Sequence, residues 1–333
     1  MINTKENANS ILGKKFIDLF AGIGGFRIAF ESFGAKCVFS SEWNKFSQEV
    51  YESNFGEIPH GDITKIHEKD IPSHDILCAG FPCQAFSVSG KQLGFEDTRG
   101  TLFFDIARIV KHHKPNVLLL ENVKNFERHD GGRTIQTVVT VLNKMGYDVY
   151  YKVLNASLFG IPQSRKRIFI WGFHERLGIK EYDFPVGTGE KVKLEDFLLS
   201  NGTIIEKCFL DIDDVKYKEN YNIKPDLFGD YSQKPIRIGT INRGGQGERI
   251  YHVKGHAITL SAYGGGVAAK TGAYLVDSKV RKLDPRECAR IMGFPDSFKI
   301  HSNPLQSWKQ FGNGVVINVA QVLIKDIIEK NIV

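Results

Sequence analysis

The strongest constraint on the fold is an alternation of short apolar runs with helical patterns over residues 14–175. Such alternation is typical of βα units stacked into a largely parallel sheet. The sequence predicts strands at 15–20, 37–41, 75–79, 116–121, 147–154 and 167–171. It predicts helices at 26–33, 101–112 and 134–145. The predicted fold class is therefore α/β, with a doubly wound, mostly parallel sheet.

The chain changes character after about residue 185. Positions 186–235 are polar and poorly periodic, whereas positions 239–272 hold nine glycines among 34 residues, with β-type runs between them. We expect a smaller glycine-rich β module there. A helix is predicted to begin at Asp284-Pro285, because proline is favoured at the first helical position. The last predicted helix spans 315–329, and the length of 333 residues suits about two domains.

Composition excludes several classes of protein. The chain is 42% apolar and 25% charged, and no apolar run approaches the roughly 18 residues of a membrane span, so we expect no membrane. The start, MINTKENANS, lacks an apolar signal core. Five cysteines without a CxxC pair, and ten histidines without ligand spacing, predict reduced thiols in a cytoplasm and no metal.

Charge is concentrated in one part of the chain. The formal net charge is +6, but residues 231–290 contain eleven Lys or Arg and four Asp or Glu, a local charge of +7. The rest of the chain therefore sums to −1. A basic segment beside a neutral body is consistent with either a solvated surface or a polyanionic partner such as nucleic acid.

A glycine-rich turn follows the first predicted strand. The sequence DLFAGIGG places Gly22, Gly24 and Gly25 between that strand and a helix, so the backbone there is able to approach a ligand closely. Glu42 ends the next strand, where a carboxylate can accept both hydroxyls of a ribose. This pattern indicates an adenosine-type cofactor, either a nicotinamide dinucleotide or S-adenosylmethionine, although the third glycine of the dinucleotide fingerprint is missing.

Reactive side chains follow the inner strands. Cys83 lies in GFPCQ just past the third strand, and Glu121 ends the next, so both should emerge at one edge of the sheet. Gln163, Arg165 and Arg167 alternate, and in one extended strand they would share a face. We expect the thiol, the carboxyl and the guanidinium groups to converge on one crevice.

This set of groups suits methylation of cytosine at C5. That carbon is a poor nucleophile until a thiolate adds to C6, and Cys83 would make this addition. Glu121 would stabilise the ring at N3, and Arg167 or Arg165 would stabilise it at O2. A base inside a duplex cannot enter such a pocket, so it must rotate out of the helix.

The ordered motifs resemble the DNA cytosine-C5 methyltransferases. They are DLFAGIGG, Glu42-Trp43, Gly61-Asp62-Ile63, GFPCQAFS, ENV at 121–123, QSRKR at 163–167, RKLDPRECARIMGFP at 281–295 and FGNGVV at 311–316. The resemblance implies a Rossmann-like, S-adenosylmethionine-dependent methyltransferase with a small glycine-rich β target-recognition domain. It implies a discontinuous catalytic domain over 1–190 and 305–333, a target-recognition domain over 191–284 and a hinge over 285–304.

The resemblance also assigns residues. The implied catalytic group consists of Cys83, Glu121, Arg165, Arg167, Gln84 and Asn122. The implied S-adenosylmethionine site, which would release S-adenosylhomocysteine, consists of Phe20, Gly22, Ile23, Gly25, Glu42, Trp43, Asp62, Ile63, Gly80, Pro82, Leu102, Asn313 and Val315. Gly314 departs from the family, which commonly has serine at this position, so one hydrogen bond on the cofactor side is in question.

The segments 244–251, 257–266, 269–272 and 274–276 are similar to the recognition region of a family member that methylates GCGC at its inner (first) cytosine. The resemblance implies that Ser89 and Gln246 fill the space left by the flipped base. It implies that Arg249 reads a guanine edge, the alternative being a plain phosphate contact. The other implied DNA contacts are Thr259, Tyr263, Gly264, Gly265 and Gly266.

Three other functions compete with this prediction: an RNA (tRNA) cytosine-C5 methyltransferase, an inactive DNA-binding regulator and a nicotinamide dehydrogenase. The recognition segment favours double-stranded DNA over RNA. The resemblance further implies a monomer in the bacterial cytoplasm, within a restriction-modification system. Its cognate restriction endonuclease would act on the same site without forming a stable complex.

Overall fold

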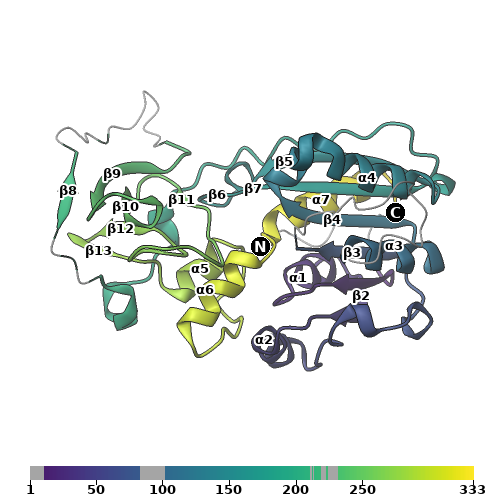
Figure 1. Cartoon of the computed structure of the whole chain (residues 1–333), viewed down its shortest axis with the longest axis horizontal. Helices are drawn as coiled ribbons and strands as arrows, with labels where there is room; N and C mark the ends of the chain where they lie inside the picture. The colour runs from purple at the N-terminus through teal and green to yellow at the C-terminus, as the bar shows by residue number, and fades with distance from the viewer. Residues whose placement is uncertain (1–10, 83–101, 211, 213, 219–222, 224–231) are drawn as a thin grey trace. The chain divides into compact units, whose positions relative to one another are not determined.

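A computed structural model describes residues 11–82, 102–210, 212, 214–218, 223 and 232–333 of the chain (Figure 1). The chain divides into two compact units. Unit 1 consists of Met1–Leu154, Arg167–Pro185 and Ala320–Val333. Unit 2 consists of Asn155–Lys166 and Val186–Val319. Each unit therefore combines segments that are far apart in the sequence.

Unit 1 is built on a six-stranded sheet with strand order β2-β1-β3-β4-β7-β5. The strands β1 to β4 pair in parallel, and β7 runs antiparallel to β4. This confirms the predicted α/β class with a mostly parallel sheet. The bounds are β1 Lys15–Leu19, β2 Lys36–Ser41, β3 Ile76–Gly80, β4 Val117–Val123, β5 Tyr147–Asn155 and β7 Lys166–His174.

Alternate side chains of these strands pack against helices on opposite faces of the sheet. Ile17 and Leu19 of β1 belong to a buried cluster that includes side chains of helices α3 and α4. Phe16, on the other face, stacks on Phe30 of helix α1 with ring centroids 5.1 Å apart. The helices of this unit are α1 Gly25–Glu31, α2 Lys45–Phe55, α3 Leu102–His113 and α4 Arg133–Asn143. The strands are thus buried on both faces, which explains their continuous apolar runs.

Unit 2 contains a five-stranded sheet of order β13-β12-β10-β9-β8 and a separate parallel pair, β11-β6. Its small core is formed by Ile238, Ile241, Ile250, Ala268 and Ala273. The strands are β6 Gln163–Ser164, β8 Val215–Tyr217, β9 Ile236–Ile241, β10 Arg249–His252, β11 Ala257–Ile258, β12 Ala273–Val276 and β13 Lys279–Arg281. The helices are α5 Pro285–Arg290 and α6 Pro304–Asn313.

The last helix, α7 (Ile317–Glu329), begins in unit 2 and ends in unit 1. In unit 1, Gln321 Nε2 donates to Ser32 Oγ at 3.0 Å, and Tyr182 Oη donates to Asp326 Oδ2 at 2.7 Å. The segment Pro304–Glu329 has the length and apolar composition of a membrane span. It is interrupted between α6 and α7, however, and Leu323, Ile324 and Ile327 are fully buried, so it is a core element of this fold.

Helices α2 and α6 were not predicted from the sequence. In α2 only Ser47, Val50 and Tyr51 are buried, so its apolar periodicity is weak. Both helices begin at an asparagine whose side-chain oxygen accepts a main-chain N–H, Asn44 for α2 and Asn303 for α6. These N-caps were the available local signal, because asparagine is favoured at that position.

Candidate active site

The glycine-rich turn after β1 is held by Glu42, at the end of the neighbouring strand β2. Gly22 N donates to Glu42 Oε2 at 2.9 Å, and Asn44 N donates to Glu42 Oε1 at 2.7 Å. Burial raises the pKa of Glu42, and these main-chain donors oppose the rise. Each carboxylate oxygen accepts at least one main-chain bond here and retains acceptor capacity for a ligand hydroxyl.

Glycine is required at two positions of this turn. Gly22 and Gly24 have φ of +57° and +85°, a region that side chains other than glycine rarely adopt. A Cβ on Gly24 would also lie 2.4 Å from the ring of Phe55 in α2. Arg27 of α1 stacks over this ring at 4.5 Å and donates to Tyr51 Oη at 3.1 Å. The turn is therefore packed rigidly against α2.

The other predicted cofactor residues of unit 1 surround this turn or follow nearby strands. The side chain of Trp43 is 78% exposed, whereas Ile23, Gly25 and Ile63 are buried. Asp62 caps the short helix Ile63–Lys65 by accepting from Thr64 N at 3.1 Å. Phe20, Gly80 and Leu102 are half-buried and Pro82 is exposed. Asn313 and Val315 belong to unit 2, where Asn313 is exposed and Val315 is buried.

Asp18, in the middle of β1, was not singled out from the sequence. Its carboxylate is 1% exposed, and neither oxygen has a hydrogen-bond partner among the described residues. Burial raises its pKa from 3.8 to about 7, opposed by the nearby Cys78 thiol and Arg27 guanidinium. The glycine-rich turn thus follows a strand that carries a buried acid with a raised pKa.

The second part of the site lies where β3 and β4 end. Gly80 of β3 pairs in register with Glu121 of β4. Asn122 Nδ2 donates to Phe81 O at 2.9 Å, which fixes the main chain that leads toward Cys83. Glu121 is 6% exposed, and its Oε1 lies 3.1 Å from Arg167 Nε. A buried acid and a guanidinium group therefore meet beside the outgoing chain.

Cys83, Gln84 and Ser89 lie outside the described residues, as does the side chain of Gln246. The predicted roles of these four residues therefore stay predictions.

Gln163, Arg165 and Arg167 do not lie in one continuous strand. Strand β6 ends at Ser164 and β7 begins at Lys166, so Arg165 lies in neither strand. Arg167 belongs to unit 1, whereas Gln163 and Arg165 belong to unit 2. The shared face depended on an extended backbone through all three residues, and the structure does not meet that condition.

Gln163 and Arg165 instead bind main-chain groups. The Arg165 guanidinium is buried and donates to the carbonyl oxygens of Leu260, Gly312 and Gly314 at 3.0, 3.0 and 2.6 Å. Gln163 Nε2 donates to Ile291 O at 2.9 Å, and its Oε1 accepts from Leu260 N at 3.1 Å. The two side chains therefore hold together three segments that are distant in the sequence.

The predicted DNA contacts of unit 2 lie at strand ends and in an adjoining loop. Arg249 is the first residue of β10, and its Nε is buried without a hydrogen-bond partner among the described residues. Tyr263 is 73% exposed, and the Nζ atom of Lys309 lies 5.4 Å from its ring centroid. Gly264, Gly265 and Gly266 are exposed. Thr259 faces inward, with Oγ1 donating to Ser164 O at 2.5 Å.

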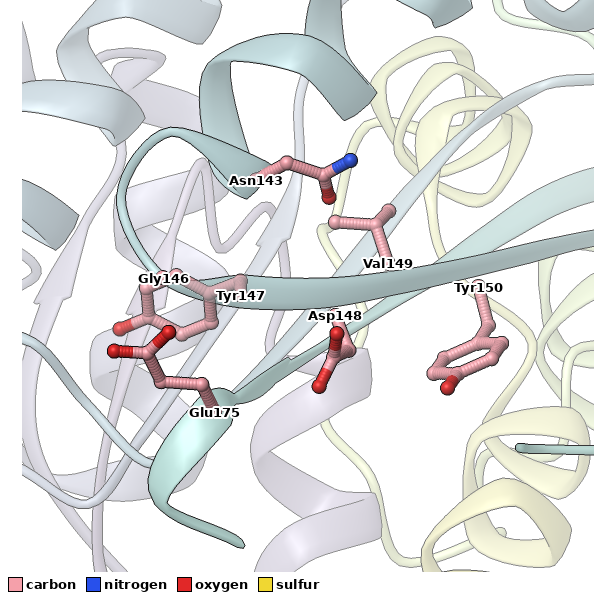
Figure 2. Close-up of a pocket in the computed structure, with 7 residues that line it drawn as sticks. All are labelled: Asn143, Gly146, Tyr147, Asp148, Val149, Tyr150 and Glu175. Atoms are coloured by element: carbon pink, nitrogen blue, oxygen red, sulfur yellow. The ribbon is translucent and has the colours of Figure 1, made fainter. Parts of the chain in front are cut away.

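A separate hollow in unit 1 contains none of the predicted site residues (Figure 2). It lies at the end of α4 and the start of β5, and is lined by Asn143, Gly146, Tyr147, Asp148, Val149, Tyr150 and Glu175.

Within the described ranges, no three His, Cys, Asp or Glu residues are grouped as metal ligands.

The sheet order, the glycine-rich turn and the carboxylate at the end of β2 define a Rossmann-like methyltransferase of the S-adenosylmethionine-dependent class. The family model of the C-5 cytosine-specific DNA methylases matches residues 14–329. The chain belongs to this family, and it is a DNA cytosine-C5 methyltransferase.

Known proteins agree with this assignment. The Type II methyltransferase M.HhaI of Haemophilus parahaemolyticus is 54% identical over 327 residues, covering 98% of this chain and 97% of the relative. M.HpaII of Haemophilus parainfluenzae is 45% identical, covering 95% and 89%. The crystal structure of a Spodoptera frugiperda DNMT2 mutant shares the fold, with a TM-score of 0.70, 20% identity and coverage of 94% and 99%.

Proposed function

We propose that this enzyme methylates C5 of the inner cytosine in duplex GCGC, with S-adenosylmethionine as methyl donor. The assignment of GCGC rests on the resemblance of segments 244–251 and 257–266 to a recognition region of that specificity. The observation that carries the chemistry is the Glu121–Arg167 pair, beside the main chain that leads to Cys83.

In the proposed mechanism the Cys83 thiolate forms a bond to C6 of the cytosine. The electron pair of the C5–C6 double bond moves into the C4–C5 bond and the C4–N3 pair moves onto N3, where the Glu121 carboxyl stabilises the developing negative charge by donating its proton toward N3. C5 becomes nucleophilic and would take the methyl group from S-adenosylmethionine, leaving S-adenosylhomocysteine as the second product. Loss of the C5 proton then re-forms the double bond and expels the thiolate, which restores the enzyme.

Arg167 is the better candidate for O2 of the cytosine. Its side chain is 16% exposed and its Nε is close to the Glu121 carboxylate, so it can face the same ring. Arg165 donates to three main-chain carbonyls, and we infer that it positions the segments around Leu260 and Gly312. Of the two arginines that the sequence offered for O2, we therefore assign Arg167 to the base and Arg165 to a positioning role.

The residues of the turn after β1 suit S-adenosylmethionine. Gly22 has open space where a Cβ would lie, Glu42 has acceptor capacity for ribose hydroxyls, and Trp43 offers an exposed indole to an adenine ring. When bound, S-adenosylmethionine would supply the methyl group from its positively charged sulfonium. Asn313 and Val315 would complete the site, and Gly314 would contribute no side-chain hydrogen bond.

The DNA side of the proposal assigns recognition to unit 2. Arg249 is partly buried, and its Nε has no hydrogen-bond partner among the residues that the structure describes, which favours a specific contact over a loosely held phosphate contact. Gln246 and Ser89 would occupy the space left by the flipped cytosine. We propose a monomer of the bacterial cytoplasm, with a cognate endonuclease that shares the site but forms no stable complex.

Two assays test this function. Bisulfite sequencing of DNA from cells that express the protein should show 5-methylcytosine at the first cytosine of GCGC. In vitro, the wild type should form a covalent complex with a duplex carrying 5-fluorocytosine at that position, and Cys83→Ser should bind the duplex without forming it. Trapping on a matched RNA hairpin instead would favour the RNA methyltransferase, and methyl transfer by Cys83→Ser equal to wild type would refute the mechanism.

A further inference from the structure

Two segments of unit 2 approach each other closely through backbone atoms of Gly247, Gly265 and Gly266. One is the short helix Gln246–Glu248, and the other is the loop 261–270. A Cβ on Gly247 would lie 2.0 Å from Gly265 O and 3.4 Å from Gly266 Cα. Gly247 has φ of −87°, which any residue adopts, so the reason for glycine here is the close approach and not the backbone conformation.

Each segment also contains an internal hydrogen bond that fixes its shape. Gly245 N donates to Glu248 Oε2 at 2.9 Å, which shapes the turn before Arg249. Ser261 N donates to Lys270 O at 2.9 Å, which closes the loop at its base. This hydrogen bond joins the two ends of the loop. The position of the loop relative to the short helix then depends on the contacts between the two segments.

Two contacts join the segments. Ala268 is 1% exposed and belongs to the core of unit 2, and its N donates to Gly247 O at 3.0 Å. The second contact is the approach of Gly247 to the Gly265-Gly266 peptide. Because Ala268 is anchored in the core, an added Cβ on Gly247 cannot be relieved by a simple side-chain rotation.

The two segments carry residues on which the proposed function depends. Arg249 follows the short helix directly, and Tyr263 to Gly266 lie in the loop. Ordinary contacts of a Cβ begin at 3.4 Å, so alanine at 247 would move the segments apart by about 1.4 Å (3.4 minus 2.0). A displacement of that size is enough to break base hydrogen bonds, which need donor–acceptor distances of about 2.7–3.2 Å.

We propose that Gly247 is a specificity-determining positioning residue: its missing side chain sets the spacing between the Arg249 segment and the Tyr263 loop, so that both read the same DNA site in register. This inference rests on the proposed function, because it assumes that the two segments contact DNA bases. It assigns to Gly247 no contact with the DNA itself.

The test compares Gly247→Ala with Gly202→Ala, a matched control whose Cβ would meet nothing within 4 Å. The preferred duplex of the wild type is identified first, and rates of labelled-methyl transfer are then measured on it and on duplexes with one base changed. Discrimination is the rate on the preferred duplex divided by the rate on a changed duplex. In Gly247→Ala this discrimination should fall on the order of 10- to 100-fold, since a good base contact discriminates by that much. Melting temperature and S-adenosylmethionine affinity should match the control.

A Gly247→Ala enzyme with the discrimination of the control would overturn the proposal. Loss of cooperative melting or of S-adenosylmethionine binding would also overturn it, because the contact would then serve folding. A wild type that prefers another sequence would contradict the GCGC assignment alone, since the same ratio is measured on that sequence. A wild type that methylates no duplex would refute the proposed function and this inference together.

Discussion

Asp18→Asn should change how the stability of the protein depends on pH. The Asp18 carboxyl is buried in β1, with its pKa raised to about 7 by burial and by the charge of Glu42, against the opposing effects of Cys78 and Arg27. In the unfolded chain the same group titrates near 3.8. The folded state therefore holds this proton more tightly than the unfolded state between about pH 4 and pH 7.

The sign and size follow from proton linkage. The stability that comes from the protonated carboxyl is complete below the unfolded pKa and is lost as pH rises through the folded pKa. A shift of about 3 pKa units corresponds to roughly 4 kcal/mol in total, of which about 3 kcal/mol falls between pH 5 and pH 8. Asparagine has no such proton to lose. The unfolding free energy of Asp18→Asn relative to wild type should therefore increase by about 3 kcal/mol from pH 5 to pH 8.

Urea unfolding of both proteins at pH 5, 6, 7 and 8 measures this difference directly. Asp183→Asn, at an exposed position in the same unit, is the matched control and should follow the wild-type profile. A difference between Asp18→Asn and wild type that stays constant across these pH values would refute the reasoning. It would mean that the carboxyl of Asp18 is ionised throughout.

Three other substitutions test contacts within the two units, namely a close approach, a set of hydrogen bonds and a buried ion pair. In Gly24→Ala the new Cβ would lie 2.4 Å from the Phe55 ring, at a residue whose φ is +85°. The substitution should weaken S-adenosylmethionine binding, measured by calorimetry, at least several-fold. Arg165→Lys keeps the charge but cannot reach three carbonyls, and should lower the unfolding free energy in urea by about 2–4 kcal/mol. Glu287→Gln leaves the buried Arg281 guanidinium, bonded at 2.7 Å, without its charge partner, and should cost about 3–5 kcal/mol in the same assay. Wild-type values in any of these would contradict the corresponding contact.

The strands of unit 1 could be predicted in outline from the sequence because their signal is local, whereas their order in the sheet could not. Runs such as Val117–Val123 are apolar throughout, since parallel strands buried between two layers have no solvent face. The antiparallel direction of β7 had no such signal. Helix α2 was missed for the opposite reason: most of its side chains face solvent, so only its cap marks it.

The candidate site also has features that the sequence predicts and features that depend on the fold. The positions of Glu42 and Glu121 at strand ends could be predicted from the sequence, because in each case a carboxyl residue follows an apolar run typical of a buried strand. The partners of Gln163 and Arg165 could not, since Leu260, Ile291 and Gly312 come together only in the folded unit. The raised pKa of Asp18 is likewise an effect of burial, which no local pattern encodes.

Sequence by itself determined the family and the enzyme class of this protein, because the motifs place characteristic residue types at fixed distances along strands and turns. Only the tertiary structure decided which arginine pairs with Glu121 and which is bound to main-chain carbonyls. It alone decided that Gly247 touches the Gly265-Gly266 peptide. Hydrogen bonds and close contacts depend on distances in space, and those distances are set by packing between segments remote in the chain.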